Sequence, residues 1–289
     1  MQSVNTNAIS SSSTIKIDKY TQASILSLAF AGTEYTILYL INSTVLTSFD
    51  VSENVQLTKL FAYGNSKVKN IDVSTLTKLT SLYAYSCALE SLNVDNNVQL
   101  TDLRCYGNKI ASLNVDNNAA LETLDLSGTS LATLDVSKNT SLATLSYKEG
   151  LKITSGFAIG RAITVNGVKG VTFYCSGTVT KIVSTDETET NWGYYETTGA
   201  TSRTDGMSNT NKITSASPAA QWCRAKGTAW YLPAIDELKS VIGATQLGTG
   251  YYWSSTEYSG ISAYMVIYNG NKEADKKNEA YYVRAVWAL

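Results

Sequence analysis

LTDLRCYGNKIASLNVDNNAA (residues 100–120) is followed directly by LETLDLSGTSLATLDVSKNTS (residues 121–141), and the two stretches share one pattern with a period of 21 residues. Further units of the same kind begin at Thr36, Leu57, Leu79 and Leu142. One unit of this length cannot bury its apolar face alone, so neighbouring units must stack around a shared core. The pattern predicts a short solenoid over residues 36–149.

Apolar residues recur at fixed positions in each unit, in the order LxxLxLxx(N/C)xL that defines a leucine-rich repeat. The first strand of each unit is expected to turn one leucine inward, which gives a column of Leu60, Leu82, Leu103 and Leu124. A second extended segment should turn another residue inward, namely Ile71, Leu92, Leu113 and Leu134. The Asn or Cys position of the template is filled by Asn65, Cys87, Asn108 and Thr129.

Polar residues also repeat with the scaffold. Asn54, Asn97, Asn118 and Asn139 recur just before the next leucine, and we expect them to turn the chain and hydrogen-bond its backbone. Asp50, Asp72 and Asp135 resemble paired catalytic carboxylates at first sight. Because they repeat with the period of the units, turn residues are the better interpretation.

LETLDLSGTSLATLDVSKNTSL resembles the short leucine-rich repeats of Bacteroidetes surface proteins, and this resemblance covers about residues 36–147. Such proteins also carry a short β-rich entry segment, which TIKIDKYTQASILSLAFAG (residues 14–32) could supply as an N-terminal cap. Residues 1–35 are therefore expected to be a polar N-terminus followed by this cap. Residues 1–13 are polar and without periodicity, so we expect them to be poorly tied down.

Aromatic residues occupy the outward positions of the predicted strand ladder. One column reads Phe61, Tyr83, Arg104 and Asp125, and the next reads Tyr63, Tyr85, Tyr106 and Ser127. Aromatic and arginine side chains dominate the energetics of protein interfaces, so this patch is a candidate ligand-binding surface. The alternative is that neighbouring aromatic rings only stabilise the ladder.

After Leu145 the rhythm ends and the composition changes. Residues 167–177 and 178–187 predict two strands around a turn, and residues 188–211 predict a long loop. Two short helices are expected next, one capped by Ser217 and one opened by Pro233. The remainder of the chain is strand-like.

Three stretches of this region resemble the C-terminal domains of Bacteroidetes surface proteins, namely PAAQWCRAKGTAWYLPAIDEL, YYWSSTEYSG and YYVRAVWAL. Those domains are similar in their C-type-lectin-like fold to the variable proteins of diversity-generating retroelements and to Fibrobacter major paralogous proteins. The resemblance implies a binding domain of two helices and a twisted antiparallel sheet over residues 150–289. The EPN, QPD and WND motifs of calcium-dependent lectins are missing, which leaves calcium-dependent sugar binding unsupported. The fold class expected for the whole chain is α+β, mostly β.

The stretch AYMVIY (residues 263–268) more often reads AWYVNF in similar sequences. Aligning the two puts Tyr264, Val266 and Tyr268 on the buried face of a strand. Alternation then sends Met265 and Ile267 to solvent. The expected ligand-binding patch consists of Tyr258, Ile261, Met265, Ile267, Asn269 and Asn271. In the opposite register Met265 and Ile267 lie in the core, since a shift of one residue inverts a strand.

Composition excludes several functions. The chain has no histidine, which excludes a Ser-His-Asp triad and a histidine-containing zinc site. The four cysteines fit no zinc-binding spacing. Cys87 and Cys105 are expected to be buried thiols, and Cys175 and Cys223 either pair or remain separate. The net charge of −1 gives no reason to expect nucleic acid as a partner. No metal site and no cofactor are predicted.

We therefore expect a non-catalytic, monomeric binding protein at the outer-membrane surface or outside the cell, recognising a surface protein or a glycan of a host or of bacteria. No secretory signal is visible at Met1, and no apolar run is long enough to span a membrane, so membrane attachment would need a lipid anchor outside this chain. The alternative is a carbohydrate-active enzyme with a carboxylate pair, either Asp186 with Glu187 or Asp236 with Glu237.

Overall fold

The computed structural model describes residues 14–17, 25–27, 35–148, 150–155, 159–174, 180–213, 217–245 and 248–288. The chain divides into two compact units, Met1–Gly156 and Phe157–Leu289, which we name the repeat unit and the C-terminal unit. The boundary lies after residue 156 rather than after residue 149, because β11 (Lys152–Ser155) still pairs with β9 (Thr133–Asp135) of the repeats. The prediction for residues 1–13 falls outside the described residues.

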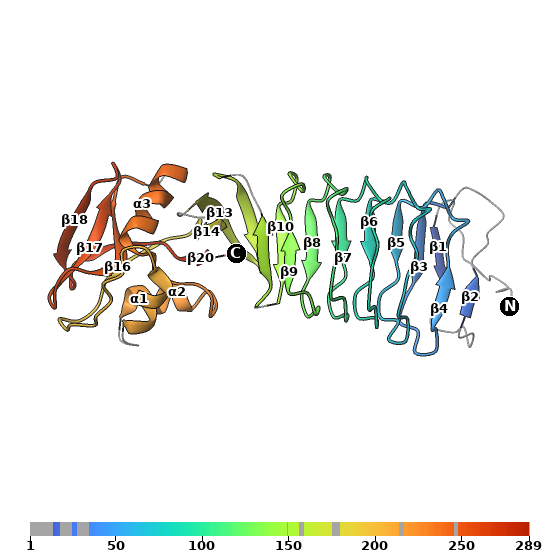
Figure 1. The fold of residues 1–289 in the computed structure, drawn as a ribbon, viewed down its shortest axis with the longest axis horizontal. Helices are drawn as coiled ribbons and strands as arrows, with labels where there is room; N and C mark the ends of the chain where they lie inside the picture. The colour runs from blue at the N-terminus through green and yellow to red at the C-terminus, as the bar shows by residue number, and fades with distance from the viewer. Residues whose placement is uncertain are drawn as a thin grey trace. The chain divides into compact units, whose positions relative to one another are not determined.

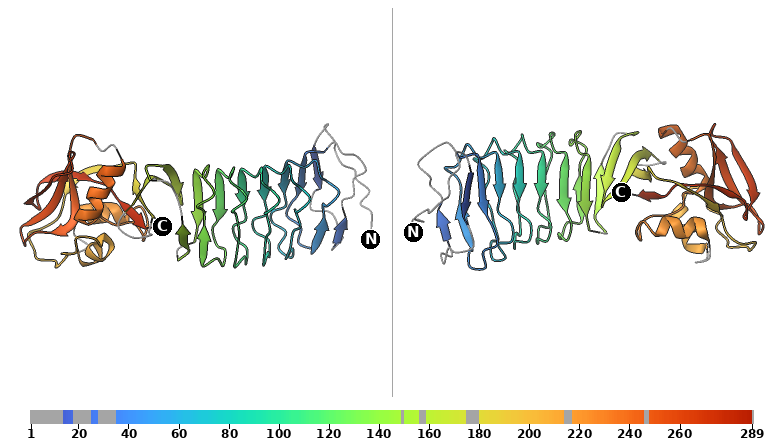
Figure 2. Two further views of the ribbon diagram at one scale, coloured as in Figure 1. Left: turned by 45° about the horizontal axis from the view of Figure 1, so that its top comes forward. Right: turned by 180° about the vertical axis from the view of Figure 1, so that it is seen from behind.

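The repeat unit is built on a ladder of short parallel strands in chain order, which all views of the ribbon show as one row (Figures 1 and 2). Each strand pairs with the strand one repeat further on, so the chain is a repeat protein with a parallel β-solenoid. The strands are β1 (Thr14–Ile17), β3 (Ile37–Leu40), β5 (Lys59–Phe61), β6 (Ser81–Tyr83), β7 (Asp102–Arg104), β8 (Thr123–Leu126) and β10 (Thr144–Tyr147).

The predicted leucine column is confirmed. Leu60, Leu82, Leu103 and Leu124 lie opposite one another in consecutive pairs of the register. All four side chains are fully buried. Because a strand alternates its side chains, the residues on either side of each leucine point outward, and they are half-buried except for the exposed Lys59.

A residue with a positive φ follows each of five strands and turns the chain out of the ladder. Glycine occupies this position at Gly64, Gly107 and Gly128, with φ between 67° and 73°. Asn42 and Ser86 adopt the same left-handed backbone at 59° and 53°. The glycines of the YGN and SGT stretches are therefore conformational requirements of the turn.

Both predicted asparagine columns tie neighbouring turns together. The amide nitrogen of Asn108 donates to the carbonyl oxygens of Ala84 and Cys105 at 2.9 Å each, and its amide oxygen accepts from the backbone N–H of Leu89. In the other column, Asn118 donates to the carbonyls of Val94 and Asn97. These bonds satisfy buried backbone carbonyls that no strand partner reaches.

The side of the solenoid opposite the main ladder is paired only near its ends. There β2 (Ile25–Ser27) pairs with β4 (Ser48–Asp50), and β9 pairs with β11. The predicted turn role of the aspartates is confirmed, since Asp50, Asp72 and Asp135 each accept from a backbone N–H two residues further on. One interior prediction is wrong: Leu113 is only half-buried.

The C-terminal unit contains two sheets. One consists, in spatial order, of β12 (Ala162–Val165), β13 (Val168–Tyr174), β14 (Thr180–Ser184) and β20 (Val286–Ala288), all antiparallel. The other consists of β15 (Thr188–Asn191), β19 (Ala280–Val283), β16 (Tyr251–Glu257), β17 (Ser262–Ile267) and β18 (Lys272–Lys276). Its pairs are antiparallel except for β16 with β19.

Helix α3 (Ile235–Ala244) packs against both sheets. Its Val241 joins a core cluster with Phe173, while its Ile235 and Leu238 join another with Val266. Helices α2 (Pro218–Arg224) and α3 match the two predicted helices, and the side chain of Ser217 caps α2 as expected.

The predicted loop over residues 188–211 is wrong, because it contains β15 and a third helix, α1 (Gly206–Lys212). Tertiary hydrogen bonds hold α1 in place. Thr210 bonds to both the carbonyl and the N–H of Leu232, and Asn209 bonds to the carbonyl of Ser202.

The cysteines behave mostly as expected. Cys105 and Cys223 are buried free thiols, whereas Cys87 is only half-buried. Cys175 lies outside the described residues. Within the part of the chain that the structure describes, no helix combines the length and the apolar character that a bilayer crossing requires.

Candidate binding surfaces

The outward side of the main ladder carries two columns of stacked aromatic rings. In one column Tyr39 stacks on Phe61 with ring centroids 4.5 Å apart, and Phe61 meets Tyr83 edge to face at 4.9 Å. In the other, Tyr85 lies between Tyr63 and Tyr106 at 4.4 and 4.3 Å, with the rings within 8° of parallel. We name these six residues the aromatic face.

A charged cluster borders the aromatic face. The hydroxyl of Tyr83 donates to Asp102 at 2.7 Å, and the guanidinium of Arg104 forms two hydrogen bonds with the same carboxylate. That guanidinium also lies 4.7 Å from the centroid of the Tyr83 ring. The hydrogen bond to Asp102 raises the pKa of Arg104, which fixes a positive charge at the rim.

The hydroxyls of Tyr83 and Tyr85 remain protonated near neutral pH. Burial, followed by the neighbouring hydroxyls of Tyr106 and Tyr63, raises the pKa of Tyr85 to about 12. Burial and Asp102 raise the pKa of Tyr83 as well. The face therefore offers neutral phenols that can donate and accept hydrogen bonds.

All six predicted residues of the repeat unit lie in this one surface: Phe61, Tyr63, Tyr83, Tyr85, Arg104 and Tyr106. Sequence reasoning missed Tyr39, which continues the column by one repeat. The face ends at the next repeat, where Asp125 lies opposite Arg104 in the register.

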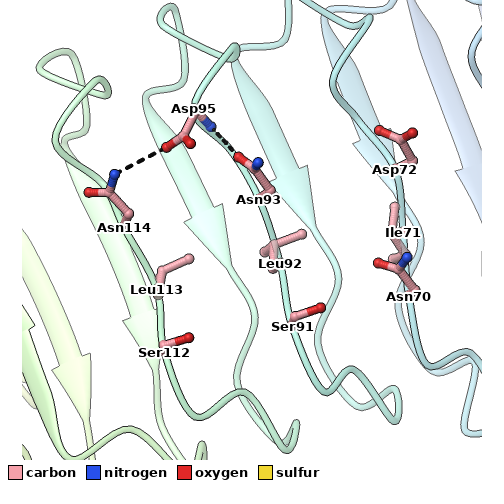
Figure 3. A pocket seen from close by; sticks show the side chains of 10 residues that line it. All are labelled: Asn70, Ile71, Asp72, Ser91, Leu92, Asn93, Asp95, Ser112, Leu113 and Asn114. Atoms are coloured by element: carbon pink, nitrogen blue, oxygen red, sulfur yellow. Dashed lines mark hydrogen bonds between the residues drawn. The ribbon is translucent and has the colours of Figure 1, made fainter.

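A groove of about 620 Å³ lies on the other side of the repeat unit (Figure 3). Three consecutive turns line it, each with a polar, an aliphatic and another polar residue. The residues are Asn70, Ile71 and Asp72; Ser91, Leu92, Asn93 and Asp95; and Ser112, Leu113 and Asn114. Leu113 lines the floor of this groove with Ile71 and Leu92, and it is half-buried whereas the other two are buried.

The patch predicted on the C-terminal unit is not one exposed surface. Met265 is 3% exposed, and Tyr268, expected in the core, is 55% exposed. Met265 lies opposite Trp253 in the register, and the buried Trp253 ring packs on Tyr281 at 4.9 Å. Both faces of β17 are therefore covered, one by α3 and the other by aromatic rings, so simple alternation was wrong.

The other members of that patch have different environments. Ile267 is half-buried, Asn269 and Asn271 are exposed, and the amide of Asn269 accepts from the backbone N–H of Asn271 within the turn. Tyr258 and Ile261 are 62% and 56% exposed.

The loops that carry Tyr258 and Ile261 meet around one buried lysine. Lys277 donates to the Glu257 carboxylate at 2.6 Å, to the carbonyl of Gly260 at 3.2 Å and to the carbonyl of Glu196. Its ammonium group also lies 4.6 Å from the Trp192 ring. Three loops, 192–199, 257–262 and 276–279, are thus held together from inside.

These loops present exposed tyrosines that sequence reasoning missed. Tyr194 and Tyr195 lie beside the lysine-bound segment, and both are exposed. The hydroxyl of Tyr195 donates to Asn278 on another of the three loops. We name Tyr194, Tyr195, Tyr258 and Ile261 the loop surface.

The carboxylates considered for catalysis all have partners. Asp236 pairs with Arg203, Asp186 with Lys226, and Glu187 with Arg284. Glu237 is buried. It accepts from Lys181 and from the Tyr231 hydroxyl on one oxygen and from the backbone N–H groups of Gly206 and Ala234 on the other.

Gly206 is tightly enclosed by this cluster. A Cβ atom there would lie 2.5 Å from Glu237 Oε2 and 2.6 Å from the Leu232 carbonyl oxygen. We expect Gly206→Ala to lower the unfolding free energy of the C-terminal unit by about 1–3 kcal/mol through overpacking. Chemical denaturation followed by tryptophan fluorescence measures it, because all five tryptophans lie after residue 191.

Gly243 in α3 is the matched control, because a Cβ atom there meets nothing within 4 Å. Gly243→Ala should raise stability by about 0.5–1 kcal/mol, since glycine is unfavourable inside a helix. Equal effects of the two substitutions would contradict the enclosure of Gly206.

No family model matches the sequence, and no curated protein matches it. Among solved structures, the chain is similar to the functional domain of InlJ from Listeria monocytogenes, which includes a cysteine ladder. The identity is 23% and the TM-score is 0.34. The match covers 47% of this chain and 40% of the InlJ chain, so the chain spans less than half of that structure.

Proposed function

We propose that this chain is a non-catalytic binding protein that recognises a polypeptide through the aromatic face of its solenoid. The observation that carries the proposal is the stack of Tyr63, Tyr85 and Tyr106, flanked by Phe61, Tyr83 and Arg104. Tyrosine and arginine are the residues that most often supply binding energy at protein interfaces. Rings already ordered by stacking lose little conformational entropy when a partner binds.

The geometry of the stack favours a polypeptide over a sugar. Sugars bind aromatic side chains by lying flat against a free ring face. Both faces of the Tyr85 ring are already occupied by its neighbours, at 4.4 and 4.3 Å. On Tyr85, the ring edge and the hydroxyl remain accessible, which suits the mixed apolar and hydrogen-bonding surface of a polypeptide.

The C-terminal unit is proposed as a second recognition module of the C-type-lectin-like kind. Its α3 helix packed on a five-stranded sheet supports this, as do the exposed tyrosines of the loop surface. We place the protein outside a bacterial cell or on its surface, in keeping with the Bacteroidetes resemblance. The composition supports this location, with 19 tyrosines and low overall charge.

A random-peptide display library selected on the full chain tests the proposal. Peptides enriched on the wild-type protein should bind it in isothermal titration calorimetry and bind Tyr85→Ser and Tyr106→Ser at least about tenfold more weakly, corresponding to about 1.4 kcal/mol. Serine is the residue that this chain itself places in the same column at Ser127, so the ladder can accommodate it.

Tyr258→Ser on the loop surface is the control, because it removes an exposed tyrosine from the other unit. It should leave the affinity for those peptides unchanged. Equal affinity of the selected peptides for wild-type and Tyr85→Ser proteins would contradict the aromatic face as the binding surface, and a loss caused by Tyr258→Ser would assign binding to the loops.

A further inference from the structure

We infer that the groove on the side opposite the aromatic face is a second binding site, and that it takes a neutral, linear oligosaccharide. This site is independent of the proposed polypeptide-binding face, because no residue of the aromatic face lines it. Its volume of about 620 Å³ falls within the usual range for ligand sites.

The groove repeats the same chemistry at each turn. Asn70, Ser91 and Ser112 form one rim, and Asp72, Asn93 and Asn114 form the other (Figure 3). Between them lies an aliphatic floor of Ile71, Leu92 and Leu113. Equivalent groups therefore recur at one spacing along the solenoid, which matches a ligand that is itself a polymer of equivalent units.

The second rim is preorganised by the backbone. The side-chain oxygens of Asp72, Asn93 and Asn114 each accept from the N–H two residues further on. The amide of Asn114 also donates to Asp95 at 3.3 Å (Figure 3). The side chains are thus held in place, and Asp72 accepts a further hydrogen bond from the Ser74 side chain.

The backbone of the groove has unused hydrogen-bonding capacity. Near both ends of this side, parallel strands pair, β2 with β4 and β9 with β11. The described segments 70–72, 91–93 and 112–114 form no strand ladder with one another. Their polar backbone groups are open to a ligand with many hydroxyls, each of which can donate and accept.

The charge of the lining selects against anions. Two carboxylates, Asp72 and Asp95, line the groove, and none of its described lining residues is lysine or arginine. Sulfated or uronic saccharides, phosphates and nucleic acids would be repelled. Neutral sugars satisfy the amides, hydroxyls and carboxylates together, and a C–H face can lie on the half-buried side chain of Leu113.

Titration calorimetry of the full chain against linear neutral hexasaccharides of glucose, mannose and galactose, with trisaccharides alongside, tests the inference. At least one hexasaccharide should bind, and its trisaccharide should bind more weakly because it spans fewer turns. Ser91→Arg and Ser112→Arg should each weaken that binding at least about tenfold, by filling the groove from an exposed position.

Thr133→Arg is the matched control, because Thr133 holds the same repeat position one turn beyond Ser112 and lies outside the groove. It should leave the affinity unchanged, as should Tyr85→Ser on the aromatic face. The inference is overturned if no neutral hexasaccharide binds, if an acidic oligosaccharide binds more tightly, or if Ser91→Arg and Ser112→Arg bind as the wild type does.

Discussion

Lys277→Met is expected to lower the unfolding free energy of the C-terminal unit by about 3–5 kcal/mol, because it leaves a buried carboxylate without its cation. Lys277 is fully buried, and its ammonium group bonds to Glu257 at 2.6 Å. The substitution also releases the carbonyl groups of Gly260 and Glu196. Urea unfolding followed by tryptophan fluorescence measures the loss.

The pH dependence of this loss identifies its cause. Burial alone would raise the pKa of Glu257, but Lys277 and the N–H groups of Thr198 and Gly199 hold it below the usual 4.5. In the wild type this stabilisation is present above pH 4.5 and is lost as the pH falls through the lowered pKa. Without Lys277, burial dominates, so the variant should approach wild-type stability as Glu257 becomes protonated.

The double variant Lys277→Met with Glu257→Gln is the control. Removing both charges should recover much of the lost stability, since a buried pair often contributes little net free energy. A double variant as unstable as Lys277→Met alone would show that the loss comes from the released carbonyls of Gly260 and Glu196 or from packing, rather than from the stranded charge.

Leu103→Ala is expected to lower the unfolding free energy of the repeat unit by about 2–5 kcal/mol by leaving a cavity. Leu103 is fully buried between Leu82 and Leu124. Far-UV circular dichroism during denaturation measures the effect on the solenoid. The tryptophan signal should not change, because the repeat unit contains no tryptophan.

Leu113→Ala is the comparison within the same turn. Because Leu113 is only half-buried at the floor of the groove, its truncation leaves less of a cavity and should cost less. Equal losses at the two positions, or a loss below about 1 kcal/mol at Leu103, would mean that the leucine column is not close-packed.

The solenoid could be predicted because the same pattern of apolar residues recurs in several consecutive units of the sequence. A single error in one unit is corrected by the others, so the inward leucines and the outward tyrosines were placed correctly. The groove could not be predicted, because it depends on how far neighbouring turns separate on the second side. No residue type in segments 91–93 or 112–114 indicates the distance between neighbouring turns.

In the C-terminal unit, prediction failed where tertiary contacts outweigh local patterns. Alternation assigns one face of a strand to solvent, yet β17 is covered on both faces, and Met265 is buried as a result. Helix α1 was missed because its residues favour turns and its support comes from Leu232 and Ser202. The burial of Glu237 had one signal, its place three residues into a helix, where a glutamate can bond back to the chain before it.

Three side-chain columns of the solenoid stop at the same junction, between the units 100–120 and 121–141, whereas the leucine column continues across it. In one column, Thr58, Thr80 and Thr101 each bond the preceding turn, and the column ends because Glu122 holds the next position. The tyrosine stack ends at Tyr106 because Ser127 holds the next position. Thr129, which replaces the asparagine, bonds the carbonyl of Leu126 in its own turn. Across this junction, Asn139 still donates to the carbonyls of Val115 and Asn118.

In a linear array of repeats, stability is the sum of unit terms and nearest-neighbour coupling terms. The coupling after residue 120 should therefore be weaker than between the earlier units, and we expect residues 36–120 to open as one cooperative block. Opening events that cost less than global unfolding should begin at residue 121 and spread toward β10, exposing those amides to hydrogen exchange first. The unit 121–141 should thus be joined to the unit before it less firmly than the earlier units are to one another.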